Sequence, residues 1–155
     1  MLLPPFLLVA DDAGRVQAMT VMLTRIGLAN EVRVSPTLSD AKAYLRGCAT
    51  SRLPVIVLTR AIVGEETGVA LIEWMRGQAD AIAALDVIAL VDESDAVACT
   101  GSQELGAILV PEPVEMRALI AAMKSLALPE QARIDPATLM VRVELWPRPG
   151  GVSRQ

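Results

Sequence analysis

Short runs of aliphatic residues alternate along the chain with longer segments in which apolar residues recur at helical spacing. The runs are predicted to be strands, because short continuous apolar stretches are typical of strands covered on both faces. The segments between them have the period of amphipathic helices. The predicted strands are residues 6–10, 31–34, 54–59, 87–91 and 107–110. The predicted helices are residues 14–26, 38–46, 67–75, 94–105 and 114–127.

Glycines mark several of the helix ends. Gly27 and Gly47 follow the first two helices, where glycine is a common stop. After the third helix, the pattern leaves open whether a helix resumes beyond Gly77 and runs toward residue 85. Strands that alternate with helices predict an α/β domain. We expect a doubly wound, five-stranded parallel sheet of the flavodoxin-like class, with helices on both faces.

The end of the chain departs from this alternation. We assign residues 1–127 to the α/β domain and residues 128–155 to a C-terminal extension. Within the extension, apolar residues alternate over 139–146, which favours a strand, whereas Asp135-Pro136 is a helix-start signal. The extension is predicted to be an extra strand or a dimerisation arm, with a helix as the alternative.

Composition and charge exclude several kinds of chemistry. The chain has 155 residues, is 53% hydrophobic, carries a formal net charge of −4 and contains no histidine. The lack of histidine excludes His-based triads, His-ligated metal sites and a phosphohistidine relay within this sequence. Acidic charge and few aromatic residues argue against nucleic-acid binding. The apolar residues 1–10 are too few to span a bilayer and lack the basic region of a signal peptide, so we expect a cytoplasmic protein with no membrane partner.

In a doubly wound sheet, function is expected at the carboxyl ends of the strands. Two adjacent carboxylates, Asp11 and Asp12, follow the first predicted strand. Such a pair suits Mg²⁺, which binds a few carboxylate oxygens plus water. Asp12 is equally suited to capping the helix that follows. Both interpretations stay open, and Mg²⁺ is expected as a cofactor only if the acidic pair is still competent to bind it.

Four features of the sequence occur together in a fixed order. They are the segment 7–12 with its acidic pair, the strand 55–59 followed by a loop and residues 68–72, the strand 87–91, and Gly106-Ala107 leading to Glu112-Pro113. Over residues 5 to about 127, this combination resembles the receiver domain of bacterial two-component response regulators. In that family the acidic pair binds Mg²⁺, and an aspartate that ends the third strand accepts a phosphoryl group. A Thr or Ser ends the fourth strand, and a lysine precedes a cis-proline after the fifth.

The chemical residues depart from the family's pattern. Asp11 and Asp12 match the acidic pair, but the acceptor position, eight residues before Gly68, falls on Arg60. Placing the acceptor at Thr59 requires a one-residue insertion. The positions of the fourth-strand hydroxyl, the family's aromatic residue, the lysine and the proline fall on Val91, Leu109, Glu112 and Pro113.

Arg60 cannot accept a phosphoryl group as an aspartate does, because a guanidinium is permanently charged and offers no lone pair. We therefore expect no phosphoacceptor and no catalytic residue. Three carboxylates and one lysine in the family sum to −2, and Asp11, Asp12, Arg60 and Glu112 also sum to −2. Our hypothesis is that Arg60 takes the cation's place and pairs with Asp11 or Asp12, with Glu112 as a further candidate partner. The alternative is that Arg60 points into solvent from a loop.

Val91 and Leu109 bear on conformational switching. In the family, phosphorylation draws the Thr or Ser inward and the aromatic residue follows. With valine and leucine at these positions, there is no hydroxyl to draw inward and no aromatic ring to follow it, so a single conformation is expected. The Glu112-Pro113 bond remains able to adopt the cis form.

The sequence thus predicts a degenerate receiver-like domain, not an enzyme, that acts through protein–protein contacts independently of phosphorylation. A histidine kinase or another regulator is the expected partner, and a homodimer through the extension is an open alternative. Two other functions also stay open. One is a working response regulator whose phosphoacceptor lies at a different residue from the one that the alignment with the family indicates. The other is a flavodoxin-like small-molecule binder, although no Gly-rich phosphate loop supports it.

Overall fold

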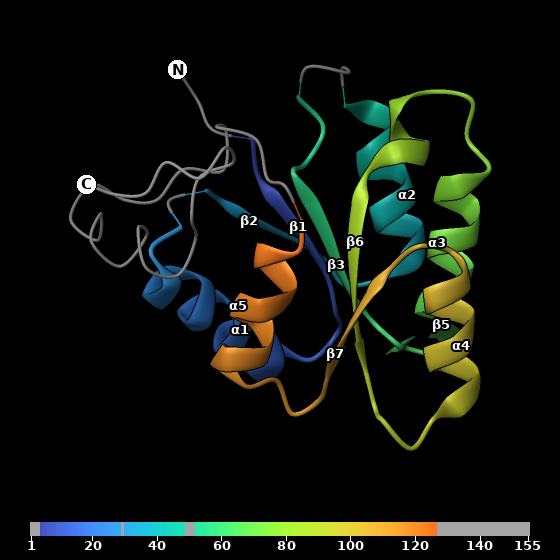
Figure 1. Ribbon diagram of the computed structural model, residues 1–155. Helices are drawn as coiled ribbons and strands as arrows, with labels where there is room; N and C mark the ends of the chain where they lie inside the picture. The colour runs from blue at the N-terminus through green and yellow to red at the C-terminus, as the bar shows by residue number, and fades with distance from the viewer. Residues whose placement is uncertain (1–3, 29, 49–51, 127–155) are drawn as a thin grey trace.

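One parallel sheet forms the centre of the molecule (Figure 1). The computed structural model describes residues 4–28, 30–48 and 52–126, so the predictions for residues 128–155 lie outside the described residues. The five strands lie in the order β2-β1-β3-β6-β7, which confirms the predicted doubly wound sheet. They are β1 (Phe6–Val9), β2 (Val32–Ser35), β3 (Ile56–Arg60), β6 (Asp86–Val91) and β7 (Ile108–Pro111).

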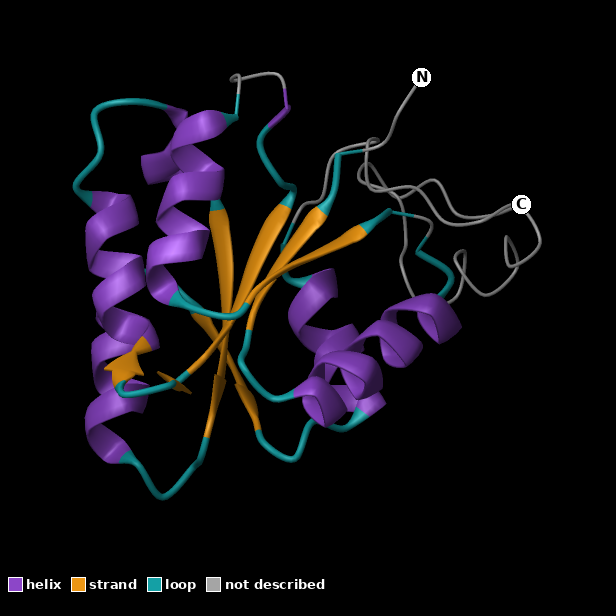
Figure 2. Ribbon diagram, turned by 180° about the vertical axis from the view of Figure 1, so that it is seen from behind, coloured by secondary structure: helices purple, strands orange, loops and turns teal. Residues whose placement is uncertain are grey.

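Helices cover both faces of the sheet. Helices α1 and α5 lie on one face and α2, α3 and α4 on the other, as Figures 1 and 2 show from opposite sides. None of the helices in the described part of the chain is long and apolar enough to cross a membrane. The α-helices are α1 (Ala13–Ile26), α2 (Leu38–Gly47), α3 (Gly68–Arg76), α4 (Ala96–Glu104) and α5 (Met116–Lys124).

Each face of the sheet has its own apolar core, because successive residues of a strand point to opposite faces. In β1, Phe6 and Leu8 pack with residues of α1 and α5, whereas Leu7 and Val9 pack with residues of α2 and α3. All four side chains are buried. This two-sided burial explains why β1 is a continuous apolar run instead of an alternating one.

The structure answers the question left open after the third helix, and two predicted helices, α4 and α5, are shorter than predicted. Beyond Gly77 the helix does not resume, and the segment contains only a 3-10 turn, η2 (Ala81–Ala84). The Asp80 carboxylate accepts a hydrogen bond from the Ile82 backbone at 3.0 Å and so begins this turn. Helix α5 begins at Met116 instead of residue 114, after extended backbone at Glu115.

A hairpin between β3 and α3 has no counterpart among the predicted elements. Its strands, β4 (Ile62–Val63) and β5 (Glu66–Thr67), have two residues each, which is too short for a recognisable alternation. Gly64 has a φ of 65° at the first position of the two-residue turn, the arrangement of a type II′ turn. Strand β3 also extends one residue further than predicted, so Arg60 ends the strand instead of beginning the loop.

Helix α3 begins directly against the end of β3. A Cβ atom at Gly68 would collide with the carbonyl oxygen of Arg60 and would lie 3.1 Å from the Thr59 hydroxyl. The Gly68 N–H donates to the carbonyl oxygen of Ala61 at 2.8 Å, which holds the helix start in this position. Glycine at position 68 therefore permits the close approach that places α3 beside the end of β3.

We predict that Gly68→Ala lowers the free energy of unfolding by about 1–3 kcal/mol, because the added methyl group must displace the backbone of β3. Gly47→Ala is the matched control, since its added Cβ meets no described atom within 4 Å apart from its chain neighbours and its own helix backbone. At the end of α2 the control is expected to be neutral or stabilising by up to about 1 kcal/mol. Urea unfolding followed by circular dichroism measures both variants, and equal midpoints for the two would contradict the prediction.

Candidate functional site

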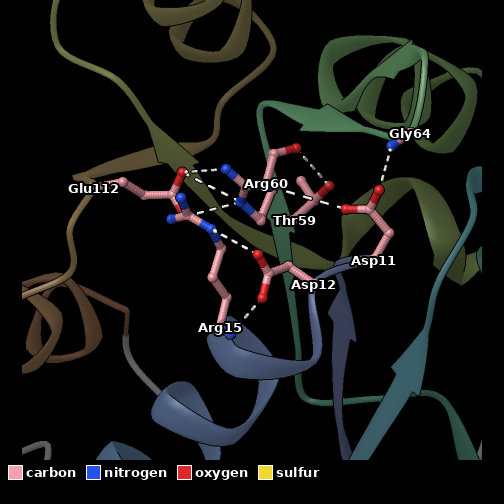
Figure 3. A network of polar contacts seen from close by, with 7 residues as sticks. All are labelled: Asp11, Asp12, Arg15, Thr59, Arg60, Gly64 and Glu112. Carbon is pink, nitrogen blue, oxygen red and sulfur yellow. Dashed lines mark hydrogen bonds and ion pairs between the residues drawn. The ribbon is translucent and has the colours of Figure 1, made fainter.

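Three strand ends bring charged residues together at one edge of the sheet (Figure 3). Asp11 and Asp12 follow β1, Arg60 ends β3, and Glu112 follows β7. Strands β2 and β3 lie on opposite sides of β1, so the chain reverses its direction across the sheet at this point. Doubly wound sheets bind their ligands at such a reversal. The structure therefore brings these four predicted site residues to the expected place.

Arg60 and Glu112 form a two-point ion pair. The Arg60 Nε donates to Glu112 Oε2 at 3.0 Å, and Nη2 donates to Oε1 at 3.1 Å. The side chains are 19% and 13% exposed, so water screens this pair less than an ion pair on the surface. Hydrogen bonding to Glu112 raises the pKa of Arg60, against the opposing effect of desolvation. The negative charges of Glu112, Asp11 and Asp12 also raise this pKa, so Arg60 is positively charged at this edge of the sheet.

Asp11 connects three parts of the site. Its Oδ1 lies 4.0 Å from the Arg60 Nη1. Its Oδ2 accepts a hydrogen bond from the Gly64 N–H at 3.0 Å, so the tip of the hairpin is held against the end of β1. Of the partners offered for Arg60, the structure places Asp11 and Glu112 against it.

Asp12 caps helix α1. Its Oδ1 accepts a hydrogen bond from the Arg15 N–H at 3.1 Å, and this bond lowers the pKa of Asp12. The side chain of Arg15 then reaches across to Glu112, where Nη1 donates to Oε2 at 3.3 Å. Of the two roles that the sequence left open for Asp12, the geometry is that of the N-cap.

Sequence reasoning missed two members of the site, Arg15 and Gly64. Arg15 lies three residues after Asp12, which is a spacing at which opposite charges meet on a helix. Gly64 contributes only a backbone N–H, for which a sequence carries no direct signal. With Arg15 included, three carboxylates and two guanidinium groups give the site a formal charge of −1, where the four predicted residues gave −2.

Thr59 lies beside Arg60 in β3 but does not join the ion pairs. Neighbouring strand residues face opposite sides of the sheet, and Thr59 is 1% exposed. Its hydroxyl donates to the carbonyl oxygen of Arg60 at 3.1 Å. Because Arg60 instead lies on the face of α1 and α5, it is the β3 residue that reaches Glu112.

Val91 ends β6, Leu109 lies in β7, and Pro113 follows Glu112. The Val91 side chain is buried, and its carbonyl oxygen accepts a hydrogen bond from the Glu112 N–H at 2.8 Å. Leu109 is partly buried against the core on the α2–α4 face. The Glu112–Pro113 peptide is cis, as the sequence allowed. Backbone contacts thus hold Glu112 at the edge of the sheet.

The residues present do not fit a magnesium site. Mg²⁺ requires a nearly octahedral set of oxygen ligands, and the end of β3 offers a guanidinium in place of a carboxylate. Asp11 and Asp12 each accept a backbone hydrogen bond, and Asp11 also faces Arg60. Over the residues that the structure describes, no group of three or more acidic, Cys or His side chains is arranged to hold a metal ion.

Comparison with known proteins gives matches at the level of structure. No family model and no curated protein matches the chain. The bacteriophytochrome response regulator AtBRR is 26% identical with a TM-score of 0.70, over 82% of this chain and 94% of that protein. The bacteriophytochrome response regulator RtBRR is 25% identical with a TM-score of 0.72, over 94% of this chain and 93% of that one. A response regulator receiver protein from Pseudomonas putida is 22% identical with a TM-score of 0.67, over 81% and 99%. The chain therefore has the fold of a response regulator receiver domain, the signalling module of two-component systems.

Proposed function

We propose that this chain is a receiver-like signalling module that works independently of phosphorylation, through contacts with other proteins. The observation that carries the proposal is the ion pair of Arg60 with Glu112 at the end of β3. The resemblance to receiver domains puts an aspartate at the position of Arg60 and a lysine at the position of Glu112. Both charges are therefore reversed relative to the family, and the reversed pair remains complementary.

The chemistry of phosphoryl transfer supports the proposal. An aspartyl phosphate forms when a carboxylate oxygen attacks the phosphorus atom, and a guanidinium has no lone pair for this attack. Both oxygens of Glu112 accept hydrogen bonds from Arg60, and Oε2 accepts a further one from Arg15. Those lone pairs are occupied, which lowers the nucleophilicity of the third carboxylate of the site.

The side chains at positions 91 and 109 favour one conformation. The family's switch depends on a hydroxyl at the position of Val91 and on an aromatic ring at the position of Leu109. Val91 is buried in the core of the α2–α4 face, and Leu109 packs against the same core. Because both positions are aliphatic, they supply neither the hydroxyl nor the aromatic ring through which phosphorylation would change the face formed by α4, β7 and α5.

The face formed by α4, β7 and α5 is the surface that we assign to a protein partner. Val97 of α4, at 85%, is the most exposed large apolar side chain among the described residues, and it lies on one of these elements. A histidine kinase or another regulator of a two-component pathway in the cytoplasm is the partner that we propose, and we propose no enzymatic activity. Dimerisation through residues 128–155 stays a prediction from the sequence.

Exposure to a small phosphodonor tests the proposal. The full chain is incubated with acetyl phosphate and Mg²⁺ and its intact mass is measured, with a receiver domain that retains its acceptor aspartate as the positive control. We predict no phosphoryl adduct on this chain, because no carboxylate occupies the end of β3. An adduct located by fragmentation at Asp11, Asp12 or Thr59 would instead support a working phosphoacceptor at a different position.

Magnesium affinity tests the role of Arg60 separately. Arg60→Asp changes the formal charge of the site from −1 to −3 and supplies the missing carboxylate ligand. We predict that it binds Mg²⁺ at least about tenfold more tightly than the wild type, as measured by calorimetry.

Arg33→Asp on β2 is the matched control for this measurement. It makes the same change in charge at a residue whose ion pair, with Glu31, lies outside the site. The control is expected to leave the weak affinity of the wild type unchanged. Tight Mg²⁺ binding by the wild type, or an equal gain in both variants, would contradict the assigned role of Arg60.

A further inference from the structure

A cleft of about 380 Å³ lies between α1 and the segment that joins β7 to α5. Leu8 and Leu90, which are buried strand residues, line it on the side of the sheet. Gly14, Ala18 and Met22 line it from α1 at intervals of four residues, which places them on one face of that helix. The small side chains at positions 14 and 18 leave space beside the sheet that larger residues would fill.

The volume and the lining of the cleft suit a small ring system. Ligand sites in proteins span roughly 300–1,000 Å³, and an apolar cavity of about 150 Å³ can hold one benzene ring. The cleft therefore has room for one or two rings. Met19 and Met22 line it, and thioether groups adapt their shape to aromatic rings and make favourable contacts with them.

The charged rim of the cleft sets the polarity of the ligand. Asp12, Arg15, Arg60 and Glu112 line this rim, and their two negative and two positive charges sum to zero. Within the described residues, the side-chain hydrogen bonds of both arginines go to Glu112, and their longer ion pairs go to Asp11 and Asp12. Each guanidinium has five N–H donors, so donors remain for an acceptor on a ligand. A balanced charge with spare donors favours an uncharged ligand that carries an acceptor oxygen.

We propose that the cleft between α1 and the β7–α5 segment binds an uncharged molecule of one or two aromatic rings with a hydroxyl or carbonyl oxygen. The rings lie against the apolar residues of α1 and the sheet, and the oxygen accepts from the guanidinium groups of Arg15 or Arg60. The proposal goes beyond a phosphorylation-independent role, since it needs neither phosphate nor Mg²⁺. The ligand would bind between α1 and the segment that leads into α5, and it would make the domain responsive to a small molecule.

Methyl NMR with 2-naphthol as the probe tests the proposal. The full chain is labelled with ¹³C at the methionine methyl groups and titrated with 2-naphthol. We expect saturable shifts at Met19 and Met22, which line the cleft, and no shift at Met75, which is buried in the core of the opposite face. The anion 2-naphthoate is expected to bind at least about tenfold more weakly, because the lining carries no net positive charge.

Two variants of α1 locate the site. Ala18→Phe fills the cleft from an exposed helix position and is expected to weaken 2-naphthol binding at least about tenfold. Gln17→Phe adds the same ring at a neighbouring exposed residue that does not line the cleft, and it should leave the affinity unchanged. Amide spectra establish that each variant is folded, and Ala18→Leu provides a smaller filling residue if the phenylalanine variant is not.

Three results would overturn the proposal. The first is the absence of saturable shifts at Met19 and Met22 up to the solubility limit of 2-naphthol. The second is equal affinity in the variants at positions 17 and 18. The third is binding of 2-naphthoate as tight as that of 2-naphthol, which would show that the cleft selects an anion. Phosphodonor labelling is unaffected by any of these results, so the two proposals stand or fall separately.

Discussion

The ion pair between Arg60 and Glu112 is the interaction on which the arrangement of the site depends. It joins the end of β3 to the segment after β7, across the intervening strand β6. Arg15 attaches α1 to the same glutamate, and Asp11 attaches the hairpin through Gly64. Two guanidinium groups and two carboxylates thereby link β3, the segment after β7, α1 and the hairpin.

The energetic role of this pair follows from its partial burial. An exposed ion pair contributes little to stability, and a fully buried pair scarcely offsets the cost of removing two charges from water. With side chains 19% and 13% exposed and two parallel hydrogen bonds, the pair lies between these limits. Removing one partner alone would leave the other with an unmet desolvation cost. A single substitution in the pair is therefore expected to destabilise the fold mainly through that desolvation cost, and less through the loss of the net attraction between the two charges.

Sequence reasoning predicted the fold well, because continuous apolar runs specify a sheet that is covered on both faces. It offered Glu112 as a candidate partner of Arg60, beside the alternative that Arg60 points into solvent, because the carboxyl ends of their strands share one edge. It placed Arg60 one residue beyond the strand, because the pattern of residues 54–59 does not reveal where pairing with β6 ends. Arg15 and Gly64 were missed for the same reason. The reach of a long side chain and the donor of a backbone N–H both depend on tertiary geometry, which a local pattern does not encode.

A double-mutant cycle on the pair tests the central claim most directly. Arg60→Met, Glu112→Gln and the double variant are compared with the wild type by urea unfolding at neutral pH, with and without Mg²⁺. We predict a coupling free energy of about 1–3 kcal/mol that added Mg²⁺ does not change, because a guanidinium instead of a metal ion holds the carboxylate. A coupling near zero, or one that Mg²⁺ abolishes, would contradict the account.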